Sequence, residues 1–332
     1  MKDAFFWTST TEARPCPLCG RREHTVVSER MQHSLDLVTV ICNECSFVFT
    51  NPLPARETYE RFYRDAYADY YGHITTPPPA TTVTQEPADL RAKFERIERV
   101  RPLKGSRVLE LGPGQGLFLW WAQHRGCSVL GIEPSPKFCS VLAQAGLPHL
   151  QCSLDGVDAV TVGQFDIIAM FHVLEHFFDP NEALSQCRSL LAPRGLLAVE
   201  VPNILKPFGS LDRYFLRYVH PSSFSPTTLE AVLAKHGFRS VHTDEGGNDW
   251  RSPQNLFVIA ENQNDVSDPS LSGPGEVAQV LHAFQDYRRR WRRGLVLKWQ
   301  ARRLALLLKR SAMKAGRPVK RVIFGGRGRS TA

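Results

Sequence analysis

The stretch Val108–Leu117, VLELGPGQGL, decides the fold of this chain. An apolar run typical of a buried parallel strand leads into an acid, Glu110, and three alternating glycines, Gly112, Gly114 and Gly116. Glycine tolerates the positive φ of a tight strand-to-helix turn and lets a ligand approach the backbone closely. The spacing G-x-G-x-G differs from the G-x-G-x-x-G of dinucleotide-binding proteins. We therefore predict a ligand-binding turn that opens a helix.

Further apolar runs follow at the pitch of alternating strands and helices. They predict a parallel sheet with helices on both faces, in which ligands bind at the carboxyl ends of the strands. One run ends at Glu133, 23 residues after Glu110, where a carboxylate can accept hydrogen bonds from a ribose diol. A surface glutamate at a strand end is the alternative. The expected strands are Ser128–Glu133, His149–Leu154, Gln164–Phe171, Leu196–Val201 and Asn255–Glu261.

The acid-x-Gly-x-Gly-x-Gly segment and the order of the segments after it resemble the class I methyltransferases, which use S-adenosylmethionine (SAM). The resemblance covers about residues 103–261. It implies an α/β fold with a Rossmann-like, seven-stranded methyltransferase sheet, whose glycine turn passes beneath the amino-acid part of SAM. It also implies a set of SAM contacts: Glu110, Gly112, Gly114, Gly116 and Glu133, with Asp155 near the adenine and His172 at the methionine end.

The segment His172–His176, HVLEH, matches the H-x-x-E-H pattern of zinc metallopeptidases, in which two imidazoles one helical turn apart hold the metal. Here the segment ends a buried strand and opens the next helix, and no third ligand is obvious downstream. It also resembles the segment after the fourth strand of many SAM methyltransferases. We therefore place it in the SAM and acceptor site, with Glu175 interpreted as an acid at a helix N-terminus.

Two histidines are the candidate catalytic residues. Methyl transfer is an in-line displacement that mainly requires alignment of the nucleophile with the methyl group and exclusion of water. A hydroxyl acceptor also benefits from a general base, and histidine suits neutral pH. We assign this role to His176 and to His220, which lies in Phe208–Phe224, a segment that the resemblance places over the acceptor. Tyr214 and Tyr218 share that segment, and each of these side chains can instead be a wall of the pocket.

Two C-x-x-C pairs near the N-terminus predict a structural zinc ribbon. Cys16 and Cys19 form one pair, and Cys42 and Cys45 form the other after 22 intervening residues. Two tight turns with two thiolates each supply the tetrahedral four-sulfur set that zinc prefers, with hairpin strands expected at 38–41 and 47–49. A redox pair is the alternative. Because zinc thiolates belong in a reducing compartment, we expect the protein to be cytoplasmic.

The rest of the chain divides around these two anchors. Six aromatic residues in Thr58–Gly72 either dock the ribbon on the main domain or cover the substrate pocket. A helix is expected at Leu90–Val100, where apolar residues recur at helical spacing. We predict these domains: residues 1–55, zinc ribbon; 56–89, aromatic segment and Pro/Thr-rich linker; 90–261, SAM-dependent methyltransferase domain; 262–275, second linker; 276–332, basic amphipathic helical tail.

Charge is distributed unevenly along the chain. Residues 282–332 hold 16 Lys and Arg against one acid, a net charge of +15, whereas residues 1–281 carry a net charge of −7. Aromatic and leucine residues recur at helical steps between the arginines, from Phe284 to Trp299. This pattern is typical of a helix lying on an anionic membrane surface, here the inner face of the membrane. A docking or oligomerisation helix and a nucleic-acid contact are the alternatives.

These features together predict a SAM-dependent methyltransferase with SAM and Zn²⁺ as its cofactors. We expect O-methylation of a saccharide, a glycan or a secondary-metabolite small molecule, with peripheral membrane contact through the basic tail. The alternative is an rRNA or tRNA methyltransferase that binds RNA through the ribbon and the tail. The acidic body of the chain makes nucleic acid the less favoured partner, because phosphate contacts dominate RNA binding.

Overall fold

A computed structural model describes residues 10–32, 35–70, 85–247, 254–263, 274–301 and 304. Residues 1–285 form one compact unit, and residues 286–332 form a second unit. Residues 71–84 of the predicted aromatic segment and linker, residues 264–273 of the predicted second linker and the tail beyond residue 304 lie outside the described residues. The two units are therefore described separately below.

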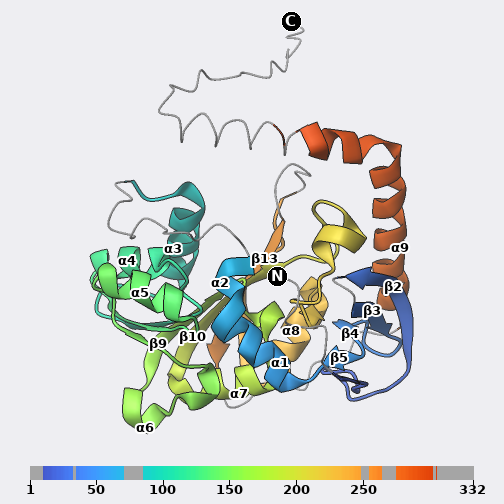
Figure 1. Cartoon of the computed structure of the whole chain (residues 1–332). Coiled ribbons are helices and arrows are strands. Elements are labelled where there is room, and N and C mark those ends of the chain that lie inside the picture. Colours follow the sequence, from blue (N-terminus) through green and yellow to red (C-terminus); the bar gives the residue numbers. More distant parts are fainter. Residues whose placement is uncertain are drawn as a thin grey trace, which may run out of the picture. The chain divides into compact units, whose positions relative to one another are not determined.

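The main sheet has seven strands among the described residues, in the order β12-β13-β10-β9-β6-β7-β8. Figure 1 labels β9, β10 and β13 of this sheet, with α3, α4 and α5 beside it. β13 pairs antiparallel with both of its neighbours, whereas the strands from β10 to β8 pair in parallel. This topology confirms the predicted Rossmann-like methyltransferase sheet. The strands are β6 (Arg107–Leu111), β7 (Ser128–Ile132), β8 (His149–Leu150), β9 (Phe165–Phe171), β10 (Leu191–Pro202), β12 (Phe238–Asp244) and β13 (Asn255–Asn262).

Helices cover both faces of this sheet. Successive residues of a strand point to opposite sides, so a strand of apolar residues has two apolar faces to bury. Ile167 of β9 packs with Phe94 of α3 and Phe118 of α4 on one face, which α5 also covers. The next residue, Ile168, packs on the other face with Leu184 of α7, and α8 continues that layer. The helices are α3 (Ala88–Val100), α4 (Leu117–His124), α5 (Pro136–Gln144), α7 (Pro180–Leu190) and α8 (Pro226–Lys235).

Three details of this domain differ from the sequence-based expectation. The strand expected at 149–154 is only the short β8, followed by a 3₁₀ turn (Leu154–Gly156) and α6 (Ala159–Val162). β12, FRSVHTD, was not expected, because its polar residues mask the pattern of a strand. The HVLEH segment forms a 3₁₀ turn (Leu174–His176) and does not open α7, which begins at Pro180 where the Asp179 side chain caps the first turn.

A second sheet carries the two C-x-x-C turns. In the described part of the chain its strand order is β11-β4-β3-β2, with every neighbouring pair antiparallel. The predicted hairpin is confirmed as β3 and β4. β11 comes from the segment between β10 and α8, so the methyltransferase part supplies a strand to the ribbon. The strands are β2 (His24–Gln32), β3 (Leu35–Cys42), β4 (Val48–Thr50) and β11 (Ser222–Ser223), with β1 (Thr11–Glu12) and β5 (Leu53–Pro54) as a small separate pair.

Polar contacts also join the ribbon to the α7 and α8 side of the main sheet. The Arg14 guanidinium donates hydrogen bonds to the Phe178 carbonyl at 2.7 Å and to the Pro221 carbonyl at 2.9 Å. The Lys235 ammonium donates to the carbonyls of Pro17 and Leu18 at 3.1 and 3.0 Å. The cysteine turns and the segment that carries His220 are therefore parts of one packed structure.

The aromatic segment folds as α1 (Arg56–Arg61), a π-helical turn (Phe62–Ala66) and α2 (Tyr67–Tyr70). The Tyr59 hydroxyl donates to the Tyr218 carbonyl, and the Phe62 ring, which is buried, lies 6.2 Å from the Tyr218 ring. These contacts support the docking interpretation, although the docked surface is the segment before His220 rather than the sheet itself. Gly72 and the last aromatic residue, Tyr71, lie outside the described residues.

The predicted C-terminal helix is present as α9 (Pro274–Arg290), followed by a π-helical turn (Trp291–Leu295) and helix at 296–301. In the first unit, Val280 and Phe284 of α9 are buried and the Glu276 carboxylate accepts a hydrogen bond from Ser46 at 3.2 Å. In the second unit, the Trp291 ring lies 5.7 Å from the Trp299 ring.

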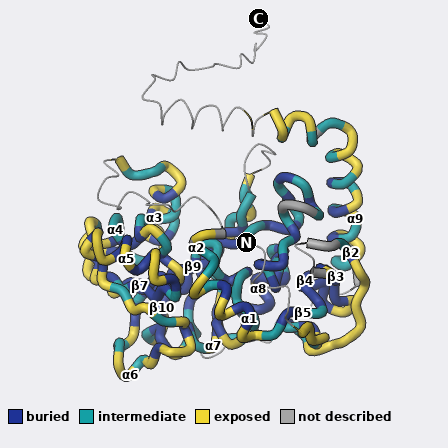
Figure 2. The backbone as a smooth tube through the Cα atoms, in the orientation of Figure 1, coloured by how far each residue is buried: buried dark blue, intermediate teal, exposed yellow. Residues whose placement is uncertain are grey.

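Burial follows this architecture: buried residues concentrate in the sheet strands, and exposed residues gather on loops and outer helix surfaces (Figure 2).

None of the helices in the described ranges combines the length and the apolar character needed to span a bilayer.

Candidate active site

The glycine turn between β6 and α4 has a left-handed backbone at every glycine. The φ angles of Gly112, Gly114 and Gly116 are +61°, +54° and +75°, values that a residue with a Cβ rarely adopts. A Cβ on Gly112 would lie 2.9 Å from the Val173 side chain, and one on Gly116 would lie 2.5 Å from two leucine side chains. At Gly114 the nearest atom would be in Phe138 at 3.8 Å. The turn is thus closely packed at both ends, and only at Gly114 would a Cβ make an ordinary van der Waals contact.

Two buried carboxylates flank this turn. Glu133 accepts hydrogen bonds from the backbone amides of Gly114 at 3.2 Å and Ser135 at 2.9 Å. Glu110 is also buried, and its Oε2 atom has no hydrogen-bond partner among the described residues. A buried acceptor without a donor is a position where a ligand group can bind. The two carboxylates predicted to contact SAM therefore lie beside the glycine turn, and Glu110 keeps an oxygen available to a hydrogen-bond donor.

Burial raises the pKa of Glu110 to about 8 and the pKa of Glu133 to about 7. The charge of Lys93 opposes this effect at Glu110, and the backbone hydrogen bonds from Ser135 and Gly114 oppose it at Glu133. A cationic or hydrogen-bond-donating ligand stabilises the ionised carboxylates and lowers both pKa values.

The other two residues predicted to contact SAM differ in their surroundings. Asp155 lies on the 3₁₀ turn after β8 and is exposed. His172 lies directly after β9 with a left-handed backbone, φ +58°. Its imidazole bridges two carboxylates, with Nδ1 at 3.4 Å from Glu175 and Nε2 at 3.1 Å from Glu200. The structure thus places His172 in an ion-pair network at the carboxyl edge of the sheet.

Lys93 of α3 completes this network, because its ammonium lies 3.0 Å from the Glu200 carboxylate. Burial lowers the pKa of His172, but hydrogen bonds to Glu175 and Glu200 outweigh burial and raise that pKa to about 9. Burial raises the pKa of Glu200, but the hydrogen bond from His172 and the charge of Lys93 outweigh it and lower that pKa to about 2. The His172 side chain is therefore an imidazolium at neutral pH, and Glu200 is ionised.

The two candidate catalytic histidines lie side by side, with the ring centroids of His176 and His220 4.7 Å apart. His176 Nδ1 lies 2.7 Å from the Val219 carbonyl and 2.8 Å from the Tyr63 hydroxyl. A carbonyl only accepts, so Nδ1 carries the proton and Nε2 keeps its lone pair. Burial lowers the pKa of His176 and lowers the pKa of His220 well below its usual value. Both rings are therefore neutral at pH 7.

The four cysteines of the ribbon are brought together as predicted. The sulfur atoms of Cys16 and Cys45 lie 3.5 Å apart, those of Cys19 and Cys42 lie 3.4 Å apart, and all four are within 4.8 Å of one another. Zinc–sulfur bonds of about 2.3 Å in a tetrahedron place the sulfurs roughly 3.8 Å apart. The donor set and its spacing therefore fit a closed structural zinc site.

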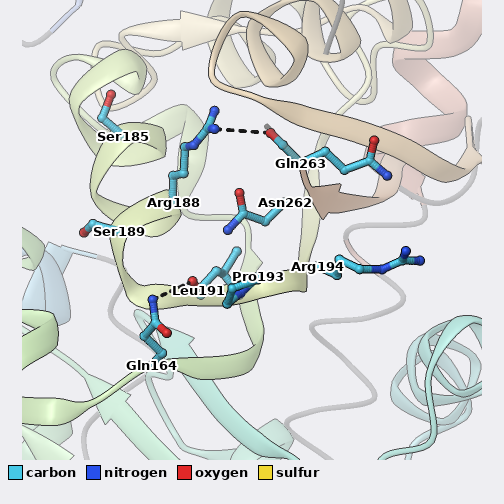
Figure 3. A pocket seen from close by; sticks show the side chains of 9 residues that line it. All are labelled: Gln164, Ser185, Arg188, Ser189, Leu191, Pro193, Arg194, Asn262 and Gln263. Atoms are coloured by element: carbon cyan, nitrogen blue, oxygen red, sulfur yellow. Dashed lines mark hydrogen bonds between the residues drawn. The ribbon is translucent and has the colours of Figure 1, made fainter. Parts of the chain in front are cut away.

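A cavity of about 740 Å³ lies elsewhere, among Gln164, Arg188, Arg194, Asn262 and Gln263 (Figure 3). It opens where β9 and β10 begin, at the edge of the sheet opposite the glycine turn. The Arg188 guanidinium there donates to the carbonyls of His236 and Gln263 at 3.0 and 3.2 Å. This cavity is therefore separate from the candidate active site.

Several residues of the site were not predicted. Glu200 was counted as part of an apolar strand, Lys93 as part of a helix, and Glu175 as an acid at a helix N-terminus, although its side chain is buried. A charged residue inside an otherwise apolar strand, LLAVEV, was the available signal for Glu200. The contact of Tyr63 with His176 depends on tertiary packing and leaves no local signal.

Comparison with known proteins agrees with this geometry. A family profile described as a methyltransferase domain matches residues 83–243. A ubiquinone biosynthesis O-methyltransferase of Rhizobium etli is 34% identical over 190 residues, which are 50% of this chain and 76% of that protein. The protein of the same description from Caulobacter sp. (strain K31) is 32% identical over 160 residues, 43% of this chain and 64% of that protein.

A tRNA U34 carboxymethyltransferase of Syntrophotalea carbinolica is 34% identical over 216 residues, 58% of this chain and 62% of that protein. In this relative and in the Caulobacter protein, the chain spans a little under two thirds of the relative's length. The fold, the glycine turn with its two carboxylates and these matches define the class: the chain belongs to the SAM-dependent methyltransferases.

Proposed function

We propose that this protein transfers the methyl group of SAM to a hydroxyl oxygen of a small molecule, with a saccharide, a glycan or a secondary metabolite as the acceptor class. One observation carries the proposal: Val173 of the HVLEH segment fills the space beside Gly112, so His176 belongs to a segment packed on the glycine turn, and the His220 ring lies against His176. This packing brings a cofactor cradle and a pair of neutral imidazoles to one edge of the sheet.

On the cofactor side, SAM supplies an electrophilic methyl group when it is bound. The middle of the glycine turn, at Gly114, leaves room for its amino-acid part. Glu133 accepts hydrogen bonds from the ribose hydroxyls, and the unpartnered Oε2 of Glu110 accepts one from a donor on the cofactor. The imidazolium of His172 holds Glu175 and Glu200 in place beside the turn.

On the acceptor side, the His176–His220 pair activates the hydroxyl group. In the absence of a metal ion, His176 Nε2 accepts the hydroxyl proton, because Nδ1 is committed to the Val219 carbonyl and the ring is neutral at pH 7. His220 lies against the same ring and lines the acceptor position. Tyr63 of the aromatic segment contacts His176 directly and forms part of the wall on this side.

We further propose that Cys16, Cys19, Cys42 and Cys45 bind one structural zinc ion. The role of this ion is to fix the ribbon, because the site has four thiolates and no open position for a substrate. Through β4 and β11 the ribbon supports the segment that carries His220.

A second candidate function is methylation or carboxymethylation of tRNA. The similarity to a tRNA U34 carboxymethyltransferase and the +15 charge of residues 282–332 favour it. The −7 charge of residues 1–281 disfavours it, because RNA binding relies on basic residues near the catalytic site.

A methyl-transfer assay with labelled SAM tests both candidates. Purified full-length protein is offered three acceptor classes in parallel: glycans and sugars, small hydroxylated metabolites, and bulk tRNA and rRNA. We expect the label to enter one of the two small-molecule classes. Alkaline hydrolysis should not release it, because a methyl ether is stable to alkali. Label in RNA alone would replace the first candidate by the second, and the absence of label from all classes with SAM bound would contradict both.

A further inference from the structure

We propose that the acceptor side of the site binds a divalent transition-metal cation through Glu175, His176 and His220. One ligand atom from each of these side chains lies within 4.8 Å of the other two. Two imidazoles and one carboxylate are the donors that zinc, cobalt and iron(II) accept at sites that keep open positions. This cluster is separate from the four thiolates of the ribbon.

Glu175 provides the first argument. Its side chain is 1% exposed, and its Oε2 atom has no hydrogen-bond partner among the described residues. Its other oxygen, Oε1, is paired with His172 at 3.4 Å. A buried carboxylate oxygen without a donor is costly, and a cation within coordination distance removes that cost. The carboxylate that carries this oxygen belongs to the same cluster as the two imidazoles.

The second argument is the way His176 is held. Metal-bound histidines usually donate their other ring N–H to a carbonyl or carboxylate, which fixes the tautomer and the ring orientation. His176 makes this contact, with Nδ1 at 2.7 Å from the Val219 carbonyl, so the lone pair is on Nε2. A histidine binds a metal ion through such a lone pair, so the Val219 contact prepares His176 as a ligand.

The charges around the cluster point the same way. The His172 imidazolium forms ion pairs with the Glu175 and Glu200 carboxylates. Arg217 is the nearby charge that opposes a cation, since it lowers the pKa of both ligand histidines. The attraction of a cation to one carboxylate and two neutral imidazoles outweighs its repulsion by Arg217, because a bound cation is in direct contact with its ligands.

The consequence rests on the proposed function. A cation held by Glu175, His176 and His220 would lower the pKa of an acceptor hydroxyl bound beside it, and the hydroxyl proton would leave to solvent because both imidazole lone pairs would be occupied. The alkoxide oxygen then forms a bond to the methyl carbon as the carbon–sulfur bond of SAM breaks and its electron pair stays on sulfur. The histidines thus act as ligands in the metal-loaded protein and as bases only without the metal.

Cobalt(II) is the probe that separates this site from the ribbon. Cobalt bound to thiolates gives strong sulfur-to-metal charge-transfer bands, whereas cobalt bound to nitrogen and oxygen gives only weak d–d bands. Full-length protein carrying zinc in its ribbon is titrated with Co²⁺ and followed by visible absorption. We expect one further equivalent of Co²⁺ with weak d–d bands and no thiolate band.

Glu175→Gln and His220→Asn should lose this equivalent, whereas the matched control His242→Asn, which alters a partly buried histidine of β12, should retain it. SAM binding by calorimetry, measured on every variant, shows that the fold is intact. Cobalt bound only with thiolate bands, or d–d bands unchanged in Glu175→Gln and His220→Asn, would overturn the proposal.

A second measurement distinguishes this proposal from the proposed function. If the chain methylates a hydroxyl acceptor, a chelator that removes the nitrogen- and oxygen-bound cobalt should reduce the rate at least tenfold, and Co²⁺ should restore it. Full activity in the chelated protein would overturn the metal site and leave the methyltransferase proposal standing. Cobalt bound at the site without methyl transfer to any acceptor class would leave the metal site standing and contradict the proposed function.

Discussion

Glu133 accepts a hydrogen bond from the backbone amide of Gly114 at 3.2 Å, so the acid at the end of β7 is bonded to the middle of the glycine turn after β6. Two sequence signals 19 residues apart therefore meet in one structure. The bond orients the Glu133 carboxylate at the carboxyl edge of the sheet, and its remaining acceptor capacity is available to a ribose diol.

Gly114→Ala should weaken SAM binding without unfolding the protein. The new Cβ would lie 3.8 Å from Phe138, an ordinary contact, but φ is +54° and the methyl group would occupy the middle of the turn. Gly146→Ala is the matched control, because its φ is +68° with open space around it, far from the turn in sequence. Both variants should lose about 1–2 kcal/mol of unfolding free energy from left-handed strain, and only Gly114→Ala should lose SAM affinity in calorimetry.

Glu133→Gln should reduce SAM affinity by about 1–3 kcal/mol, the scale of a hydrogen bond to a charged group. The amide keeps the size of the side chain and loses one of the two carboxylate acceptors. The same calorimetric titration measures it, with thermal unfolding as the check on the fold. Unchanged affinity in this variant would remove Glu133 from the cofactor site.

The parts of the fold that the sequence predicted are those encoded by local pattern. Apolar runs, the glycine turn and the cysteine pairs each specify a structure within about ten residues, and the sheet topology follows from their order. β12 was missed because its alternation carries arginine, serine and histidine on a half-exposed edge strand. β11 has only two residues and exists because β4 offers it a partner.

The site was predicted less completely, for a physical reason. Glu110, Glu133 and His172 stand at or next to strand ends, where motif and position coincide. The roles of Glu200 and Lys93 depend on strand register and on the docking of α3, which no local pattern records. Glu175 was interpreted as an acid at a helix N-terminus, but burial and the ion pair with His172 place it in the interior.

The ligand-free protein should lose stability as pH rises from about 6.5 to 9. The folded pKa of Glu133 is about 7 and that of Glu110 about 8, so the folded state keeps protons that the unfolded state releases near its usual pKa of 4.5. The folded pKa of His172 is about 9, so its stabilisation is complete below 6.5 and is lost as pH rises through 9. All three groups act in the same direction, Glu133 up to about pH 7, Glu110 up to about pH 8 and His172 up to about pH 9. Each buried glutamate contributes up to about 1.4 kcal/mol per pH unit, and the partly exposed His172 contributes less because solvent screens its ion pairs.

Denaturant unfolding at pH 6.5, 8 and 9 measures this slope. His172→Asn should make the slope shallower above pH 8, and asparagine tolerates the left-handed backbone at this position. His124→Asn, at an exposed position, is the control and should leave the slope unchanged. A stability that rises with pH over this range would contradict the assigned pKa directions.

Cys45→Ser should remove the zinc and destabilise the whole first unit. Elemental analysis of the unaltered protein should give one zinc per chain from the ribbon, because four thiolates form a closed site and the formation of such a site is part of folding. Since β4 pairs with β11 two residues from His220, loss of the ribbon should also reduce methyl transfer. Cys152→Ser, outside the cluster, should keep its zinc and its unfolding temperature. Full zinc content in Cys45→Ser would contradict the assignment.

The basic tail is predicted to attach the protein to an anionic membrane surface. Its charge of +15, alongside a body of −7, gives attraction of about 1 kcal/mol for each Lys or Arg near an anionic leaflet. Trp291 and Trp299 provide rings that insert at the interface, and Leu297 is 68% exposed. A chain ending at residue 285 keeps the whole first unit, so it should bind SAM normally and fail to sediment with phosphatidylserine vesicles at low salt.

Trp291→Ala with Trp299→Ala in the full chain should weaken sedimentation while keeping the charge. If full-length protein ignores these vesicles and instead binds RNA with a steep salt dependence, the tail serves nucleic acid and the tRNA candidate moves to first place.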